Sequence, residues 1–220
     1  MTQNNQVTRA PALAALAFVS WAGVLLQLWL SINLALANGK TAGDGIVAFF
    51  GYFTVLSNLF VAFAATLPLI ARSTRLGRLF GNPMMLGCAT TAILLVGIAY
   101  HLLLRHVWAP QGLQLLADNL LHYVVPTSAL AYWVLYPPRS RLGFMAPLVW
   151  CLYPAGYLVY VLVRGVAVGS YPYHFIDVAN LGYRQVLING SGLLVAFLVL
   201  GVFVVGVTAI RNRFRADSGT

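Results

Sequence analysis

The sequence predicts an all-α polytopic membrane protein, a bundle of six transmembrane helices that forms one domain over residues 1–220. Of the 220 residues, 60% are hydrophobic and 8% are charged, and the mean hydropathy is +0.83. A soluble domain with a polar surface is excluded by this composition. The apolar residues also fall into six runs of roughly 20 to 26 residues, each long enough to cross a hydrocarbon core about 30 Å thick.

The six spans are predicted from the polar and helix-breaking residues between the apolar runs. The first is too long for a cleaved signal peptide and has no convincing cleavage site. The third follows Asn82-Pro83, and the fourth stops at Pro137-Pro138, which cannot continue a helix. The fifth contains Pro147 and Pro154, so a bend is expected there. The approximate spans are 12–36, 46–71, 84–104, 115–136, 143–164 and 185–210, and the longest loop is expected over 165–184.

Basic residues set the expected orientation. The net charge of +9 comes from 13 basic and four acidic residues, and because the arginines cluster at span ends, anionic lipid headgroups are the expected partner, with no nucleic acid. More basic residues in cytoplasmic loops predict that both termini are cytoplasmic. One side carries Arg9, Arg72, Arg75, Arg78, Arg139, Arg141, Arg211, Arg213 and Arg215, and the other carries Lys40, Arg105, Arg164 and Arg184.

Two polar stretches interrupt the apolar spans. In the second span, Thr54 and Asn58 lie one helical turn apart, with Ser57 beside them. In the fourth span, Asp118 and His122 have the same spacing. Such groups either tie helices together or mark a functional site, since ionisable side chains are costly inside a membrane.

The predicted topology puts the two stretches at one level. Spans two and four both start on the outer side, and Thr54 and His122 each lie about eight residues, or roughly 12 Å, into their span. Asp118 is placed to hold His122 in one tautomer. The three side chains therefore predict a nucleophile, a base and an orienting carboxylate. The alternative is a structural Asp-His pair near the headgroups.

A metal site and a second serine site were weighed as alternatives. The four histidines do not form an HxxxH or HExxH pattern, and His101 and His106 are five residues apart, so no metal and no cofactor are expected. Cys88 and Cys151 have no ligand spacing. The stretch Asn189-Gly190-Ser191-Gly192 is similar to the Gly-x-Ser-Gly of rhomboid proteases, but its first glycine is missing and no histidine follows Ser191.

A broader resemblance covers nearly the whole chain. The stretch Tyr52-Phe53-Thr54 with Ser57-Asn58, the stretch from Leu121 to Pro126, and Tyr171-Pro172-Tyr173-His174-Phe175 with Gly182-Tyr183 resemble the androgen-induced and androgen-dependent TFPI-regulating membrane proteins, especially their bacterial six-span relatives. The resemblance implies a multi-pass protein of the bacterial inner membrane. It further implies a threonine hydrolase that cleaves fatty acid esters of hydroxy fatty acids, with Thr54 and His122 at the matching positions.

The hypothesis from the sequence is an intramembrane ester hydrolase whose site is entered from the lipid. His122 takes the proton of Thr54, which attacks the ester carbonyl, and a water hydrolyses the acyl-threonine. The expected substrate is a membrane lipid with acyl chains. Neutral ester lipids or fatty acid conjugates are expected over phospholipids, because no basic residue is expected at the level of the site to hold a phosphate. The rival classes are a transport or lipid-binding protein and a structural protein. Candidates for substrate or oxyanion contacts are Asn58, Ser57, Tyr52, Tyr173 and His174.

Overall fold

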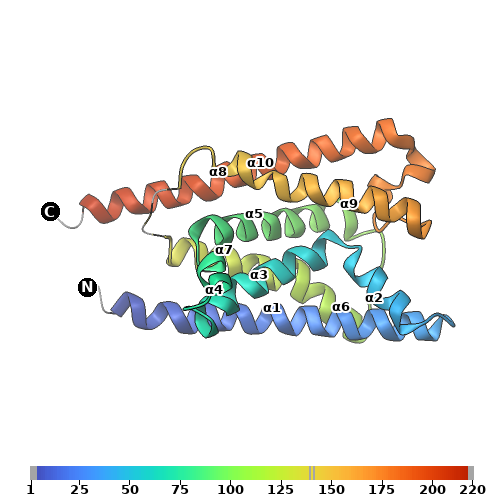
Figure 1. Cartoon of the computed structure of the whole chain (residues 1–220), viewed down its shortest axis with the longest axis horizontal. Helices are drawn as coiled ribbons and strands as arrows, with labels where there is room; N and C mark the ends of the chain where they lie inside the picture. The colour runs from blue at the N-terminus through green and yellow to red at the C-terminus, as the bar shows by residue number, and fades with distance from the viewer. Residues whose placement is uncertain (1–3, 139, 141, 218–220) are drawn as a thin grey trace.

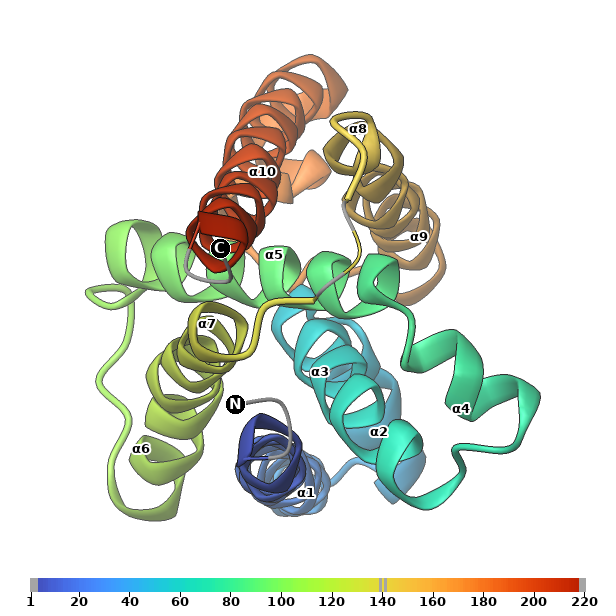
Figure 2. The same ribbon diagram turned by 90° about the vertical axis from the view of Figure 1, so that its left-hand side faces the viewer.

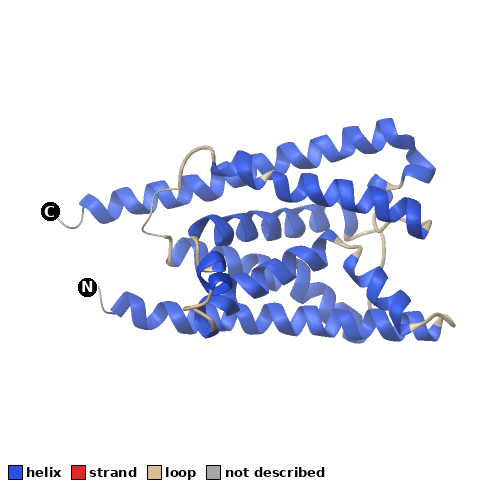
Figure 3. Cartoon of the chain, viewed as in Figure 1, coloured by secondary structure: helices blue, strands red, loops and turns tan. Residues whose placement is uncertain are grey.

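The computed structural model describes residues 4–138, 140 and 142–217, and this part of the chain is helical without strands (Figures 1 and 3). Long apolar runs with few breakers form the helices, as the hydropathy pattern predicts. The elements in order are α1 (Asn4–Ala37), α2 (Ala42–Phe50), α3 (Phe53–Ile70), α4 (Arg75–Phe80), α5 (Pro83–Ala99), the π-helix η1 (Tyr100–Leu104), α6 (Gly112–Asn119), the π-helix η2 (Leu120–Val124), α7 (Val125–Leu135), α8 (Ala146–Trp150), α9 (Leu152–Val168), the 3₁₀ helix η3 (His174–Ile176) and α10 (Val178–Asp217).

Within the described residues, five helical segments are long and apolar enough to cross a membrane. They are Arg9–Ala37, Phe53–Ile70, Pro83–Leu104, Ala146–Val168 and Val178–Phe214. The expected fourth span, 115–136, is not among the five. It corresponds to α6, η2 and α7, which follow one another without a gap, and its polar residues Asp118, Asn119 and His122 reduce its apolar character. The helical membrane fold is confirmed, and the count of six stays a prediction.

The expected second span, 46–71, is not one helix. α2 ends at Phe50 and α3 begins at Phe53, with Gly51 and Tyr52 between them. A break of this kind leaves carbonyl groups at the end of α2 without helical partners. Three side chains of α9 fill that need from another part of the chain: Tyr157 donates to the carbonyl of Gly51 at 3.0 Å, Tyr160 to Phe50 at 3.2 Å and Arg164 to Val47 at 3.2 Å.

The expected loop 165–184 is partly helical in the structure, and Gly182, with a φ of 72° and a ψ of 159°, breaks α10 close to the expected start of the sixth span at 185. α9 continues to Val168 and ends at Gly169, whose φ of 73° is in the left-handed region that favours glycine. α10 begins at Val178, and the Asp177 carboxylate accepts from the main-chain N–H groups of Ala179 and Asn180 as a helix cap. The bend expected from the two prolines of the fifth span stays a prediction, since α8 and α9 are separated only by Cys151, whose φ of −59° and ψ of −19° are in the right-handed helical region.

α5 runs through the middle of the bundle, with α9 and α10 on one side and α1, α3 and α7 on the other (Figures 1 and 2). Its central residues from Gly87 to Val96 are all buried. Small residues permit this close packing, since Gly87 lies against the rings of Trp133 and Trp150. The Trp133 indole donates to the carbonyl of Val204 at 2.9 Å, which joins α7 to α10.

The first turns of α1 and the last turns of α10 lie at the same end of the bundle (Figure 1). At this end Arg9 donates to the hydroxyl of Tyr132 on α7 at 3.2 Å. Arg139 and Arg141, two of the residues on which the predicted orientation depends, lie outside the described residues. The opposite end contains the junction of α2 with α3 and the connection from α9 to α10, and the predicted site residues gather near these segments.

Candidate active site

Thr54 is the second residue of α3, immediately after the break in the helix. Its side chain is 8% exposed, so it is buried at the start of an apolar helix. The first N–H groups of a helix have no acceptor within the helix, and the preceding Tyr52 provides no side-chain cap. The N–H of Thr54 instead donates to the hydroxyl of Tyr173 at 3.2 Å. A residue distant in sequence therefore caps α3 at the candidate nucleophile.

His122 lies in η2, where the helix widens into a π turn. Pro126 follows four residues later and has no N–H to donate to the carbonyl of His122, and its ring crowds that carbonyl. A π turn just before the proline relieves this conflict, and such turns occur frequently at functional sites. A second π turn, η1, begins at Tyr100, and the Tyr100 ring stacks on the His122 ring with centroids 3.9 Å apart.

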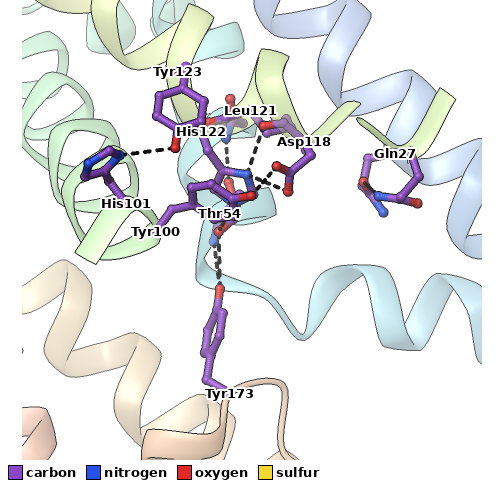
Figure 4. Close-up of polar contacts among 11 residues, drawn as sticks. Gln27, Thr54, Tyr100, His101, Asp118, Leu121, His122, Tyr123 and Tyr173 are labelled. Atoms are coloured by element: carbon purple, nitrogen blue, oxygen red, sulfur yellow. Dashed lines mark hydrogen bonds and ion pairs between the residues drawn. The ribbon is translucent and has the colours of Figure 1, made fainter. Parts of the chain in front are cut away.

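The structure brings Thr54, His122 and Asp118 into contact (Figure 4). Thr54 Oγ1 lies 3.3 Å from His122 Nε2. His122 Nδ1 lies 3.2 Å from Asp118 Oδ1 and 3.0 Å from the main-chain oxygen of Asp118. Because Nδ1 faces two acceptors, a neutral imidazole carries its proton there, and Nε2 is left to accept from the Thr54 hydroxyl. This is the order of groups that activates a hydroxyl nucleophile.

Tyr100 contacts the candidate site, although the sequence did not indicate it. Its hydroxyl donates to Asp118 Oδ2, and both side chains are buried, at 5% and 3% exposure. One carboxylate oxygen is thus held by Tyr100 and the other faces His122. The signal in the sequence is weak, since Tyr100 is a single tyrosine at the end of an apolar span, a position usual for interfacial aromatic residues.

Tyr173 connects the segment between α9 and α10 to the nucleophile (Figure 4). Its hydroxyl lies 3.3 Å from Thr54 Oγ1. Since the Thr54 hydroxyl donates to His122, Tyr173 is the donor in this contact. Burial raises the pKa of Tyr173 to about 12, so the phenol keeps its proton at neutral pH. Of the five predicted contact residues, Tyr173 is the one placed to stabilise negative charge at Thr54.

The other four predicted contact residues have different positions. Both amide hydrogens of Asn58 are used, by the carbonyls of Thr54 at 2.8 Å and Leu121 at 3.2 Å, so Asn58 joins α3 to η2. The Ser57 hydroxyl pairs with that of Tyr153 at 3.3 Å, away from His122. The ring of Tyr52 packs edge-on against the ring of Tyr173, with the two ring centroids 5.6 Å apart. His174 is exposed and contacts the ring of Phe175.

Thr54 and Tyr173 lie in the wall between two cavities. The smaller, of about 290 Å³, is almost entirely apolar and is lined by residues of α3, α5, α9 and α10 that include Phe53, Leu95 and Leu194. The larger, of about 940 Å³, adjoins α1, α2, α6 and η2 and contains His122. Arg164 also lines the larger cavity. The expectation that no basic residue lies at the level of the site fails at Arg164, the last residue of the expected fifth span, because α9 packs beside the α2–α3 junction.

The alternative metal site and the alternative serine site have few of the contacts that their chemistry requires within the described residues. No three His, Cys, Asp or Glu side chains gather in a metal-binding arrangement within the described residues. His101 and His106 both contact Arg105, at 2.9 and 2.8 Å. Ser191 lines the smaller cavity, and among the contacts of the described residues none joins it to a histidine.

Comparison of the chain with family models, curated proteins and solved structures finds no match. The class of the protein therefore follows from its fold and site alone: a helical membrane protein in which a half-buried histidine contacts a buried threonine and a buried aspartate.

Proposed function

We propose that the protein is an intramembrane threonine hydrolase that cleaves ester bonds of lipids. The observation that carries this proposal is the chain of contacts from Thr54 through His122 to Asp118, located where two cavities meet. A threonine that only joins two helices needs hydrogen bonds but no space in front of its hydroxyl. A nucleophilic threonine needs the hydrogen bonds and also space for the substrate. The resemblance to the androgen-induced membrane protein family implies the same reaction at the same two residues, Thr54 and His122.

In the proposed reaction, His122 Nε2 accepts the proton of Thr54 Oγ1 while that oxygen bonds to the ester carbonyl carbon. The Asp118 carboxylate stabilises the imidazolium through Nδ1–H. The tetrahedral intermediate collapses, the ester C–O bond breaks, and His122 returns the proton to the departing alcohol. His122 then deprotonates a water, which attacks the acyl-threonine and releases the fatty acid and the free Thr54 hydroxyl.

The oxyanion of the intermediate requires donors close to Thr54 Oγ1. The O–H of Tyr173 and the N–H of Thr54 itself lie there. Before substrate binds, the N–H donates to the Tyr173 oxygen and the Tyr173 O–H donates to Thr54 Oγ1. The start of α3 adds the partial positive charge of a helix N-terminus. Removal of one oxyanion donor typically costs about 3 to 4 kcal/mol of transition-state stabilisation.

The two cavities suit an ester with two arms. The smaller apolar cavity fits the acyl chain that is transferred to Thr54, and the larger cavity fits the alcohol portion, in which polar groups are tolerated. Fatty acid esters of hydroxy fatty acids, the substrates that the resemblance implies, have this form. The proposed catalysis uses no cofactor.

For the membrane arrangement we propose six spans, with α6, η2 and α7 together as the fourth and both termini in the cytoplasm of a bacterial cell. The nine-to-four distribution of basic residues supports this orientation. The site then lies in the outer half of the inner membrane, because the junction of α2 and α3 is at the opposite end of the bundle from both termini (Figure 1).

The proposal is tested with purified full-length protein in detergent or nanodiscs. A fluorophosphonate probe and a long-chain fatty acid ester are expected to report Thr54-dependent labelling and hydrolysis, both lost in Thr54→Ala and His122→Ala. Thr91→Ala is the matched control, because Thr91 is a buried threonine whose hydroxyl donates to the carbonyl of Gly87. Hydrolysis by Thr54→Ala at the wild-type rate contradicts the proposal, as does a covalent adduct on another residue.

A further inference from the structure

Arg164 lies beside the nucleophile in space although it is far from it in sequence. It lines the same cavity as Thr54 and His122. Its guanidinium rests against Gly51, three residues before Thr54, and a Cβ atom at Gly51 would lie only 2.9 Å from Arg164 Cζ. A glycine at this position therefore makes room for the cation beside the site.

The hydrogen bonds of Arg164 leave part of its capacity unused. A guanidinium has five N–H donors, and two are used: NH1 donates to the carbonyl of Ser170 at 3.3 Å and NH2 to that of Val47 at 3.2 Å. The Nε–H is buried without a partner. Both known acceptors are neutral carbonyls, so these contacts hold the side chain in place without compensating its charge.

The charges that face the larger cavity do not compensate Arg164 either. Two acidic side chains line this cavity, Asp44 and Asp118. Asp44 accepts from the N–H and hydroxyl of Thr41 at 2.8 and 2.7 Å, and Asp118 faces His122 and Tyr100. Among the described residues no ion pair involves Arg164. Lys40 also lines this cavity, and it is the charged neighbour of Asp44.

A cation without a counter-ion beside a membrane-embedded site is costly and indicates a bound anion. We propose that Arg164 is a specificity-determining residue that binds an oxyanion group, a carboxylate or a phosphate, at the end of the substrate portion in the larger cavity. The guanidinium suits both groups, because its planar donors match their paired oxygens. This inference rests on the proposed hydrolysis, and it makes the preferred substrate an anionic ester lipid.

The first test compares hydrolysis of matched esters. One carries a terminal carboxylate on its alcohol portion, the second is its methyl ester, and the third carries a phosphate at the same place. The wild-type protein is expected to favour the charged esters by about tenfold or more in kcat/KM, as the loss of a charged hydrogen bond implies. In Arg164→Gln this preference falls to about one, whereas Arg164→Lys keeps part of it.

Arg105→Gln is the matched control, because Arg105 contacts His101 and His106 and does not line either cavity. This variant is expected to keep the wild-type preference. If Arg164 serves only to clamp α2, Arg164→Gln lowers the hydrolysis of charged and neutral esters by the same factor, which overturns the inference. A wild-type protein without preference for the charged esters also overturns it.

Binding of ether analogues, which cannot be hydrolysed, separates this inference from the proposed reaction. Wild-type protein and Thr54→Ala are both expected to bind the carboxylate or phosphate ether about tenfold more tightly than the methyl-ester form, and Arg164→Gln is expected to bind them equally. The charged analogue that binds more tightly shows whether Arg164 prefers a carboxylate or a phosphate. Equal binding of charged and neutral analogues by the wild-type protein contradicts the anion site, whatever the outcome of the hydrolysis assay.

Discussion

Replacement of Asp118 by Asn is expected to slow ester hydrolysis by about 10- to 150-fold. The Nδ1–H of His122 has two acceptors, Asp118 Oδ1 at 3.2 Å and the main-chain oxygen of Asp118 at 3.0 Å. The main-chain acceptor persists in the variant and still holds the tautomer. The loss is therefore one charge-assisted hydrogen bond to the imidazolium, about 1.5 to 3 kcal/mol, at about 1.4 kcal/mol for each factor of ten. Where the carboxylate alone fixes the tautomer, the corresponding loss is about 10⁴-fold.

The assay measures kcat for a long-chain ester, with protein in detergent micelles. Unfolding of the Asp118→Asn variant in detergent is measured beside the rate, so that a loss of the fold is distinguished from a loss of catalysis. Asp177→Asn is the control, because Asp177 caps α10 and does not contact His122.

Two results would refute this reasoning about Asp118. A loss as large as that of His122→Ala would mean that the main-chain carbonyl does not hold the tautomer. An unchanged rate would mean that the carboxylate does not act on His122 at all.

Three further predictions concern the surroundings of the site. Tyr173→Phe is expected to lower kcat by about 10²- to 10³-fold with little change in KM, because it removes an oxyanion donor; an effect confined to KM would contradict this role. In Gly165→Ala, the new Cβ would lie 2.0 Å from the ring of Tyr171. This clash is expected to lower the free energy of unfolding by about 1 to 3 kcal/mol and to reduce hydrolysis. The control Gly156→Ala has open space at its Cβ and is expected to change neither. Asn58→Ala is expected to destabilise the fold by about 2 to 3 kcal/mol, because it leaves a buried carbonyl unpaired; unchanged unfolding in detergent would argue against that helix tie.

Most of the helical membrane architecture could be predicted from hydropathy along the sequence, because crossing a membrane requires a long apolar run. The break at Gly51 could not, since the second apolar run continues through it. The break is stabilised by Tyr157, Tyr160 and Arg164, which donate to the end of α2 from more than 100 residues away. Hydropathy carries no information about such partners.

The contacts of the candidate site also differ in whether the sequence could predict them. The contact of Asp118 with His122 follows from the spacing of four residues along a helix, so the sequence could predict it. The contact of Thr54 with His122 could be predicted only as a shared depth in the membrane. Tyr100 was missed because its partner lies on another helix, and a tyrosine near a span end has a common alternative explanation at the membrane interface.

By itself, the sequence determined that the chain forms apolar helices and that one hydroxyl and one imidazole-carboxylate pair interrupt them, because both properties depend on local composition and on helical spacing. The tertiary structure alone decided which groups face that hydroxyl. Tyr173 and Arg164 reach the site through the packing of α9 and the following segment against the α2–α3 junction. Contacts of this kind depend on how helices pack in three dimensions, and no short-range pattern in the chain encodes them.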